Sequence, residues 1–185
     1  MIETERLLIR PLTADELRCY SDSPLELVRI LGLQTPVTPV GTELKAAIEN
    51  TFLPNLEDES KSPLFNTVWI IIEKNKQCII GGLCFHGEPD SNGMAEIGYG
   101  IDDAFQNSGF MSEAVSGIID WSKKQEIIKT LVAETYSSNL ASIRVLEKCG
   151  FRLIKSTDTG LCLIMNFDVK EGSIQIITLF VFISL

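Results

Sequence analysis

The stretch from Phe105 to Ala114 constrains the fold most, because a short polar loop there joins a strand pattern to a helix pattern. Residues 94–101 predict a strand, and apolar residues then recur at helical spacing: Met111, Ala114, Val115, Ile118 and Ile119. The first turn of a helix has unpaired backbone N–H groups and a partial positive charge. Such a junction suits a phosphate, and Gly109 lets the backbone approach a ligand closely. The same pattern also fits an ordinary strand–loop–helix connection.

A second motif favours the first interpretation. Residues 138–151 follow the loop and its helix after one further strand pattern. Together the two stretches resemble the GCN5-related N-acetyltransferase (GNAT) superfamily. Gln106-x-x-Gly109-x-Met111 matches its pyrophosphate loop, Gln/Arg-x-x-Gly-x-Gly/Ala, except at the last position. Asn139-x-x-Ser142, followed by Glu147-Lys148-x-Gly150-Phe151, matches the helix and strand that end its cofactor site.

Three features resemble the branch of this superfamily that acetylates the N-termini of ribosomal proteins. They are Met111 in the loop, Leu146 where many members have tyrosine, and the opening residues 5–12. The resemblance extends over residues 3–167 and implies one domain, residues 1–170. The implied fold is the α/β acyl-CoA N-acyltransferase fold. Its mixed, mostly antiparallel sheet has helices on both faces and a V-shaped splay, expected here after Ile97.

The resemblance also implies acetyl-CoA as co-substrate, an amine as acceptor, and no metal. The backbone N–H groups of residues 107–112 are expected to bind the diphosphate, and the splayed strand to pair with the pantetheine arm as an added strand does. The residues expected to contact acetyl-CoA are Tyr99, Gly100, Ile101, Gln106, Asn107, Ser108, Gly109, Phe110, Met111, Ser112, Asn139 and Ser142.

Direct attack on the thioester requires a neutral amine, so a group must take its proton. Glu96 is the first choice for this base; the alternatives are that it only binds the ammonium or faces solvent. Leu146 cannot protonate the leaving thiolate, so that role passes to Ser142, to Tyr136, to water, or to nothing. The single histidine, His86, is interpreted as a surface or loop residue rather than a catalytic one.

Residues of the second motif admit a second, purely structural interpretation. Asn139 is also a good N-cap, with Ser142 in the first helical turn. Arg144 and Lys148 either meet the 3′-phosphate of coenzyme A or remain solvated on the helix surface.

Charge and cysteine content exclude several other classes of protein. The net charge is −9, which argues against nonspecific binding of nucleic acid. The five cysteines are scattered without a Cys-x-x-Cys pair, and one histidine is too few for a typical zinc site. We interpret the cysteines as mostly buried apolar residues in a reducing compartment. With an acidic start that is unlike a secretory signal, the sequence predicts a cytoplasmic protein.

Several local expectations can be tested in the structure. Pro54 is expected to end the helix that Thr42 begins, and Gly81-Gly82 to mark a bulge or a close contact in a strand. In the helix after Asn139, the residues expected on the buried face are Leu140, Ile143, Leu146 and Cys149.

The chain ends in an apolar tail, residues 171–185, whose last twelve residues carry no charge. Twelve residues are too few to span a bilayer, so no membrane partner is expected. An added strand, a contact with a second copy in a homodimer, and a read-through tail all fit this composition.

Two acceptors remain open for the implied enzyme: a protein N-terminal α-amine, which the branch features favour, and a small-molecule amine. The rival class is a noncatalytic acyl-CoA-binding sensor or interaction module, because a tyrosine is missing at position 146. A nucleotide-binding domain is weaker, since no Gly-Lys-Ser/Thr accompanies the loop.

Overall fold

A single eight-stranded sheet organises the protein, whose computed structural model describes residues 1–167. Its strand order is β1-β2-β3-β4-β5-β6-β8-β7, and every neighbouring pair is antiparallel except β5 and β6. The strands are β1 (Ile2–Glu3), β2 (Leu7–Pro11), β3 (Val68–Glu73), β4 (Cys78–Phe85), β5 (Met94–Ile101), β6 (Thr130–Tyr136), β7 (Arg152–Ser156) and β8 (Gly160–Asn166). The predicted mixed, mostly antiparallel α/β fold is confirmed.

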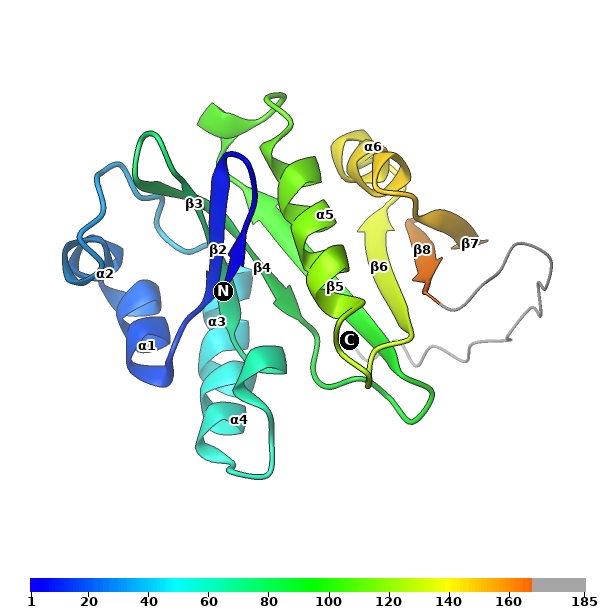
Figure 1. Ribbon diagram of the computed structural model, residues 1–185, viewed down its shortest axis with the longest axis horizontal. Coiled ribbons are helices and arrows are strands. Elements are labelled where there is room, and N and C mark those ends of the chain that lie inside the picture. Colours follow the sequence, from blue (N-terminus) through cyan, green and yellow to red (C-terminus); the bar gives the residue numbers. More distant parts are fainter. Residues whose placement is uncertain (168–185) are drawn as a thin grey trace.

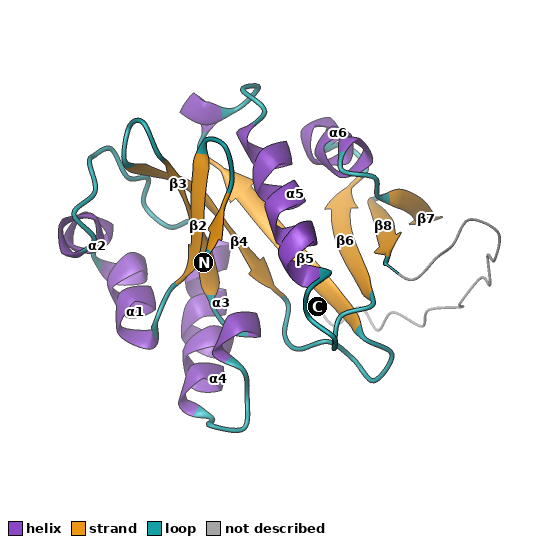
Figure 2. Ribbon diagram, in the orientation of Figure 1, coloured by secondary structure: helices purple, strands orange, loops and turns teal. Residues whose placement is uncertain are grey.

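Helices cover both faces of the sheet (Figures 1 and 2). The α-helices are α1 (Ala14–Asp22), α2 (Pro24–Ile30), α3 (Thr42–Ala47), α4 (Leu53–Glu57), α5 (Phe110–Ser122) and α6 (Leu140–Lys148). A π-helical segment, η1 (Ile48–Phe52), joins α3 to α4, and two 3₁₀ turns are η2 (Pro63–Phe65) and η3 (Asp103–Phe105). In the described residues, no helix has both the length and the apolar character needed to cross a membrane.

Alternation along β3 explains why the protein has two cores. Trp69 and Ile71 pack in the cluster that includes α5 and Leu146 of α6. Val68 and Ile70 point the other way, into the cluster formed with α1, α2 and η1. Successive strand residues face opposite sides of a sheet, so both faces of this central strand are apolar and covered.

The sheet opens between β5 and β6. Only Met94–Glu96 pair with Thr130–Val132, although β5 continues to Ile101 and β6 to Tyr136. Beyond Glu96, β5 remains bonded to β4 while β6 remains bonded to β8. The V-shaped splay implied by the resemblance is present, but it begins after Glu96, one residue before the expected position after Ile97.

A bulge in β4 accompanies this opening. Ile71 pairs with Gly81 and Ile72 with Ile79, so Ile80 is an extra residue in β4. Such a bulge bends its strand and increases the local twist, and β5 follows β4 away from β6. The close contact predicted for Gly81-Gly82 is confirmed at Gly81, where a Cβ would overlap the carbonyl oxygen of Gly100, and the bulge lies at the preceding residue, Ile80.

Two local predictions were wrong. Pro54 does not end the helix, because the segment before it is π-helical. There the N–H of Leu53 bonds to the carbonyl of Ile48, five residues earlier, in place of the usual α-helical hydrogen bond. Leu140 is 59% exposed rather than buried, since α6 covers an opening in the sheet and not a paired surface. Leu146 is fully buried as predicted, whereas Cys149 is only partly buried.

Among the five free cysteines, Cys78 and Cys162 are buried and the other three are partly buried. The apolar tail, residues 171–185, lies outside the described residues, so its predicted role stays a prediction.

We predict that Gly81→Ala lowers the free energy of unfolding by about 1–3 kcal/mol, because the new methyl group forces the β4 and β5 backbones apart. Urea unfolding measures the change. Gly100→Ala is the matched control, since a Cβ there meets no atom within 4 Å. Equal losses in the two variants would contradict the close strand approach.

Candidate active site

The loop before α5 presents a row of backbone donors. Asn107 and Gly109 both have left-handed backbones, with φ of 57° and 79°, and they turn the chain sharply into the helix. No side chain caps α5 at Gly109. Among the described residues, no acceptor bonds to the backbone N–H groups of residues 107–112. Successive free N–H groups at a helix N-terminus form an anion-binding concavity.

These donors face a cleft of about 440 Å³ between β5, the loop and α6. Most residues predicted to contact the cofactor line it: Tyr99, Gly100, Ile101, Gln106, Asn107, Gly109, Phe110, Met111, Ser112, Asn139 and Ser142. Ser108 and Glu96 do not. Phe105, Ala141 and Val145 also line the cleft, and the sequence analysis missed them because their apolar character indicates only core. Arg144 and Lys148 line it as well and add positive charge.

Tyr99 of β5 and Ser142 of α6 meet across the opening. The Tyr99 hydroxyl lies 2.9 Å from the Ser142 hydroxyl. Asn139 caps α6, since its Oδ1 accepts a hydrogen bond from the backbone N–H of Ser142 at 3.1 Å. Burial raises the pKa of Tyr99 to about 12, so this phenol keeps its proton at neutral pH. The opening therefore contains a hydroxyl pair that can donate hydrogen bonds.

The structure narrows the choice of groups that can reach a leaving thiolate. Leu146 is buried in the core and Tyr136 is 72% exposed, and neither lines the cleft. Of the protein groups named from the sequence for this role, only Ser142 lies in the cleft.

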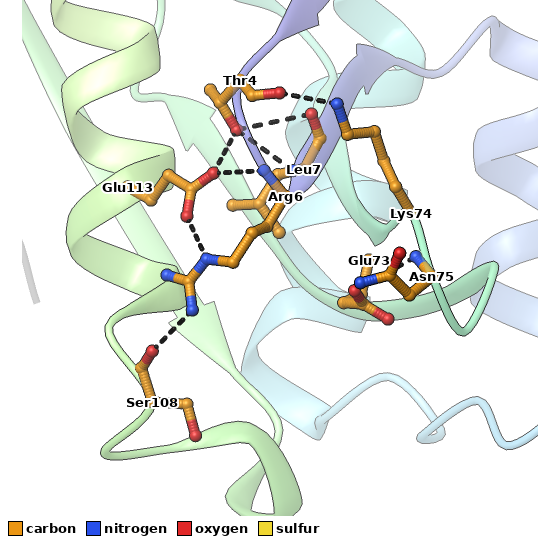
Figure 3. Close-up of polar contacts among 8 residues, drawn as sticks. All are labelled: Thr4, Arg6, Leu7, Glu73, Lys74, Asn75, Ser108 and Glu113. Carbon is orange, nitrogen blue, oxygen red and sulfur yellow. Dashed lines mark hydrogen bonds and ion pairs between the residues drawn. The ribbon is translucent and has the colours of Figure 1, made fainter.

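The turn between β1 and β2 holds the loop through Arg6, which pairs with Glu113 of α5 (Figure 3). Arg6 Nε lies 2.6 Å from Glu113 Oε2, and Arg6 Nη1 donates to the carbonyl of Ser108 at 3.0 Å. The Arg6 guanidinium also stacks 4.3 Å from the centre of the Phe110 ring. Thr4 Oγ1 and the Arg6 backbone N–H both donate to Glu113 Oε1, at 2.6 and 2.7 Å.

This arrangement keeps Glu113 ionised. Burial alone would raise its pKa, but the hydrogen bonds from Thr4 and Arg6 outweigh that effect and lower the pKa below 4.5. From the sequence, the opening residues 5–12 stand out only as a family feature. Their contact with the loop spans more than a hundred residues, as between Arg6 and Glu113, and no local spacing indicates it.

Glu96 lies outside the cleft, on the other face of β5. Its neighbours Ala95 and Ile97 face the core beneath α5, so its side chain points away from that core. Its Oε1 lies 2.9 Å from Nδ1 of His86. His86 lies at the surface directly after β4, as predicted, but its pair with Glu96 was not predicted.

Comparison with known proteins identifies the family. The family model described as "Acetyltransferase (GNAT) domain" matches residues 6–152. The uncharacterized N-acetyltransferase YjdG of Bacillus subtilis is 31% identical over 153 residues, which cover 83% of this chain and 90% of that protein. The chain therefore belongs to the GNAT acetyltransferase family.

Solved structures share the fold. The ribosomal L7/L12 α-N-protein acetyltransferase RimL in complex with coenzyme A matches with a TM-score of 0.61 and 18% identity, covering 89% of this chain and 96% of that one. The ribosomal-protein-S5-alanine acetyltransferase from Vibrio fischeri matches with a TM-score of 0.61 and 17% identity, covering 92% and 98%.

We predict that Glu113→Gln lowers the free energy of unfolding at pH 7 by about 1–2 kcal/mol, because a charged acceptor of three hydrogen bonds is lost. A carboxylate with a lowered pKa stabilises the fold above its unfolded-state pKa, and this stabilisation disappears as the pH falls through its folded-state pKa. The difference between wild type and variant should therefore shrink below pH 4.5. Urea unfolding across this range measures it.

Glu26→Gln is the control, because it removes an ion pair to Arg29 whose side chains are 48% and 77% exposed. Its cost should stay below about 0.5 kcal/mol. If both variants behaved alike, Arg6 and Glu113 would not be holding the loop.

Proposed function

We propose that the protein transfers an acetyl group from acetyl-CoA to a primary amine by direct attack. One observation carries this proposal: the free N–H groups of residues 107–112 and the unpaired edge of β5 face the same cleft. The diphosphate of acetyl-CoA needs N–H donors, and its amide-bearing pantetheine arm needs a free strand edge, so both must lie in the same cleft.

The donor set fits coenzyme A along its length. The N–H groups at the start of α5 suit the diphosphate, with Arg144 and Lys148 adding positive charge on α6. From Ile97 onward, the edge of β5 toward β6 is unpaired, so it can bond the pantetheine amides as a sheet bonds an added strand. Gly100 leaves room for that approach, because a Cβ there would meet no atom within 4 Å.

When bound, acetyl-CoA supplies the acetyl thioester. Glu96 takes a proton from the acceptor ammonium on the opposite face of β5, which frees the nitrogen lone pair for attack. Ser142, hydrogen-bonded to Tyr99, donates a hydrogen bond to the departing sulfur. Among the described residues, no cluster of three or more His, Cys, Asp or Glu side chains is arranged to hold a metal ion.

The first acceptor we propose is a protein N-terminal α-amine, and the second is a small-molecule amine. Met111, Leu146 and the opening residues resemble the branch that modifies ribosomal proteins, and RimL is described as acting on ribosomal L7/L12. The net charge of −9 attracts either cationic acceptor.

The test follows release of the CoA thiol with a panel of amines. Peptides with free and N-acetyl-blocked N-termini, otherwise identical and free of lysine, form the matched pair. We expect release with the free peptide only. A protein that binds acetyl-CoA but releases no thiol with any amine in the panel would contradict the proposal.

We predict that Glu96→Gln lowers kcat by about 10²–10⁴-fold, because the amide cannot accept the ammonium proton. Calorimetric titration should find acetyl-CoA binding unchanged, since Glu96 lies outside the cleft. Retention of wild-type kcat would remove Glu96 from the reaction.

We predict a smaller effect for Ser142→Ala, a loss of about tenfold in kcat, because one hydrogen bond to the developing thiolate is removed. Ser137→Ala, which alters a hydroxyl bonded to the Asp158 carbonyl at 3.4 Å outside the cleft, is the control. An effect on KM alone would assign Ser142 to binding rather than to the leaving group.

A further inference from the structure

Three side chains gather on the sheet face opposite the cleft: Cys84 and His86 at the end of β4, and Glu96 on β5. The backbone N–H of His86 donates to the carbonyl of Glu96 at 2.9 Å, so the two strands are still bonded here. Glu96 is also the last residue of β5 that pairs with β6. The group therefore lies at the point where the sheet opens.

Gly98 makes room for the imidazole. A Cβ at Gly98 would lie 2.7 Å from His86 Nε2 and 3.5 Å from Cys84 Sγ. The ring thus occupies the space that a side chain at position 98 would fill. This places the imidazole over β5 only two residues before Gly100, which lines the cleft from the other side.

The His86 imidazole and the Glu96 carboxylate form an ion pair. Nδ1 lies 2.9 Å from Oε1, and the side chains are 50% and 37% exposed, so an acceptor can approach from solvent. Hydrogen bonds to Cys84 and to Glu96 raise the pKa of His86 to about 10 despite partial burial. The imidazole is therefore an imidazolium at neutral pH and cannot itself take the proton of the acceptor.

The other titratable groups near Glu96 supply no second cation that could take the place of His86. Glu134 of β6 and Cys162 of β8 are register partners in the sheet, and their side chains lie on the same face as that of Glu96. Burial, with the charges of Glu134 and Glu96, raises the pKa of Cys162 to about 11, so this thiol stays neutral. Among the described residues, His86 is the cationic group that contacts the Glu96 carboxylate.

We propose that His86 is a positioning residue whose imidazolium holds the Glu96 carboxylate at the acceptor side of the opening. One carboxylate oxygen is bound to Nδ1, and the second oxygen is left for the incoming ammonium. One proton moves from the ammonium nitrogen to Glu96, and the freed lone pair forms the bond to the acetyl carbon. The carbon–sulfur bond of the thioester breaks, and its electron pair leaves with the CoA sulfur, which receives the second proton of the amine nitrogen. His86 keeps its own proton throughout. This inference rests on the proposed role of Glu96 as the base.

The first test observes His86 directly, since it is the single histidine of the chain. In protein prepared without a histidine tag, its imidazole proton signals are followed by NMR as the pH is raised. We expect no titration between pH 6 and 8 in the wild type, and a midpoint at lower pH in Glu96→Gln, where the contact with Cys84 remains. A wild-type midpoint near 6.5 would overturn the inference.

The second test is a double-mutant cycle on kcat. His86→Ala should lower kcat by about 10–100-fold with KM for acetyl-CoA unchanged, because the base loses its orientation. His86→Asn should recover most of the rate, since its amide nitrogen can occupy the place of Nδ1. In the Glu96→Gln background, His86→Ala should cost little more, because residues that act as a unit are not additive.

Glu16→Gln is the matched control, because it breaks a comparable, partly buried pair with Arg10 at 2.6 Å, away from the opening. It should alter stability without lowering kcat. If Glu96→Gln abolishes turnover while His86→Ala keeps the wild-type rate, only this inference fails. If Glu96→Gln retains full activity, the proposed base itself is wrong. If His86→Ala does not fold, the kcat of His86→Asn and the NMR titration still test the inference.

Discussion

The rest of the structure depends on a short parallel pairing: three residues of β5 bond to three of β6, and then the strands separate. A longer ladder would close the sheet and leave no edge for a ligand. The bulge at Ile80 and the close approach of Gly81 to Gly100 keep β5 with β4 instead. One strand thereby presents the cleft on one face and the pair of Glu96 and His86 on the other.

A second constraint fixes the loop that completes the cleft. Its two left-handed residues leave N–H groups free for an anion, and free donors do not hold a loop in place. Arg6 does so from outside, through Ser108, Phe110 and Glu113. The turn between β1 and β2 is therefore part of the site although it does not line the cleft.

Much of this architecture could be predicted from the sequence, because it is local. The strand, loop and helix around Gly109 follow from periodicity and glycine chemistry, and the family resemblance carried by the order of the motifs implies the fold. The contact of Arg6 with Glu113 could not be predicted, since it joins residues distant in sequence. The pair of His86 with Glu96 could not be predicted either, because it depends on the register between β4 and β5. The prediction that Pro54 ends the helix was wrong because a π-helical segment depends on tertiary packing, which no short sequence pattern indicates.

Calorimetric titration of the full-length protein with acetyl-CoA, coenzyme A and ATP tests the central claim most directly. If the opening between β5 and β6 is built for an acyl-CoA, both CoA species should bind with one-to-one stoichiometry and micromolar dissociation constants, and ATP should give no heat. Absence of binding by either CoA species, or equal binding of ATP, would contradict this account of the loop and the opened sheet.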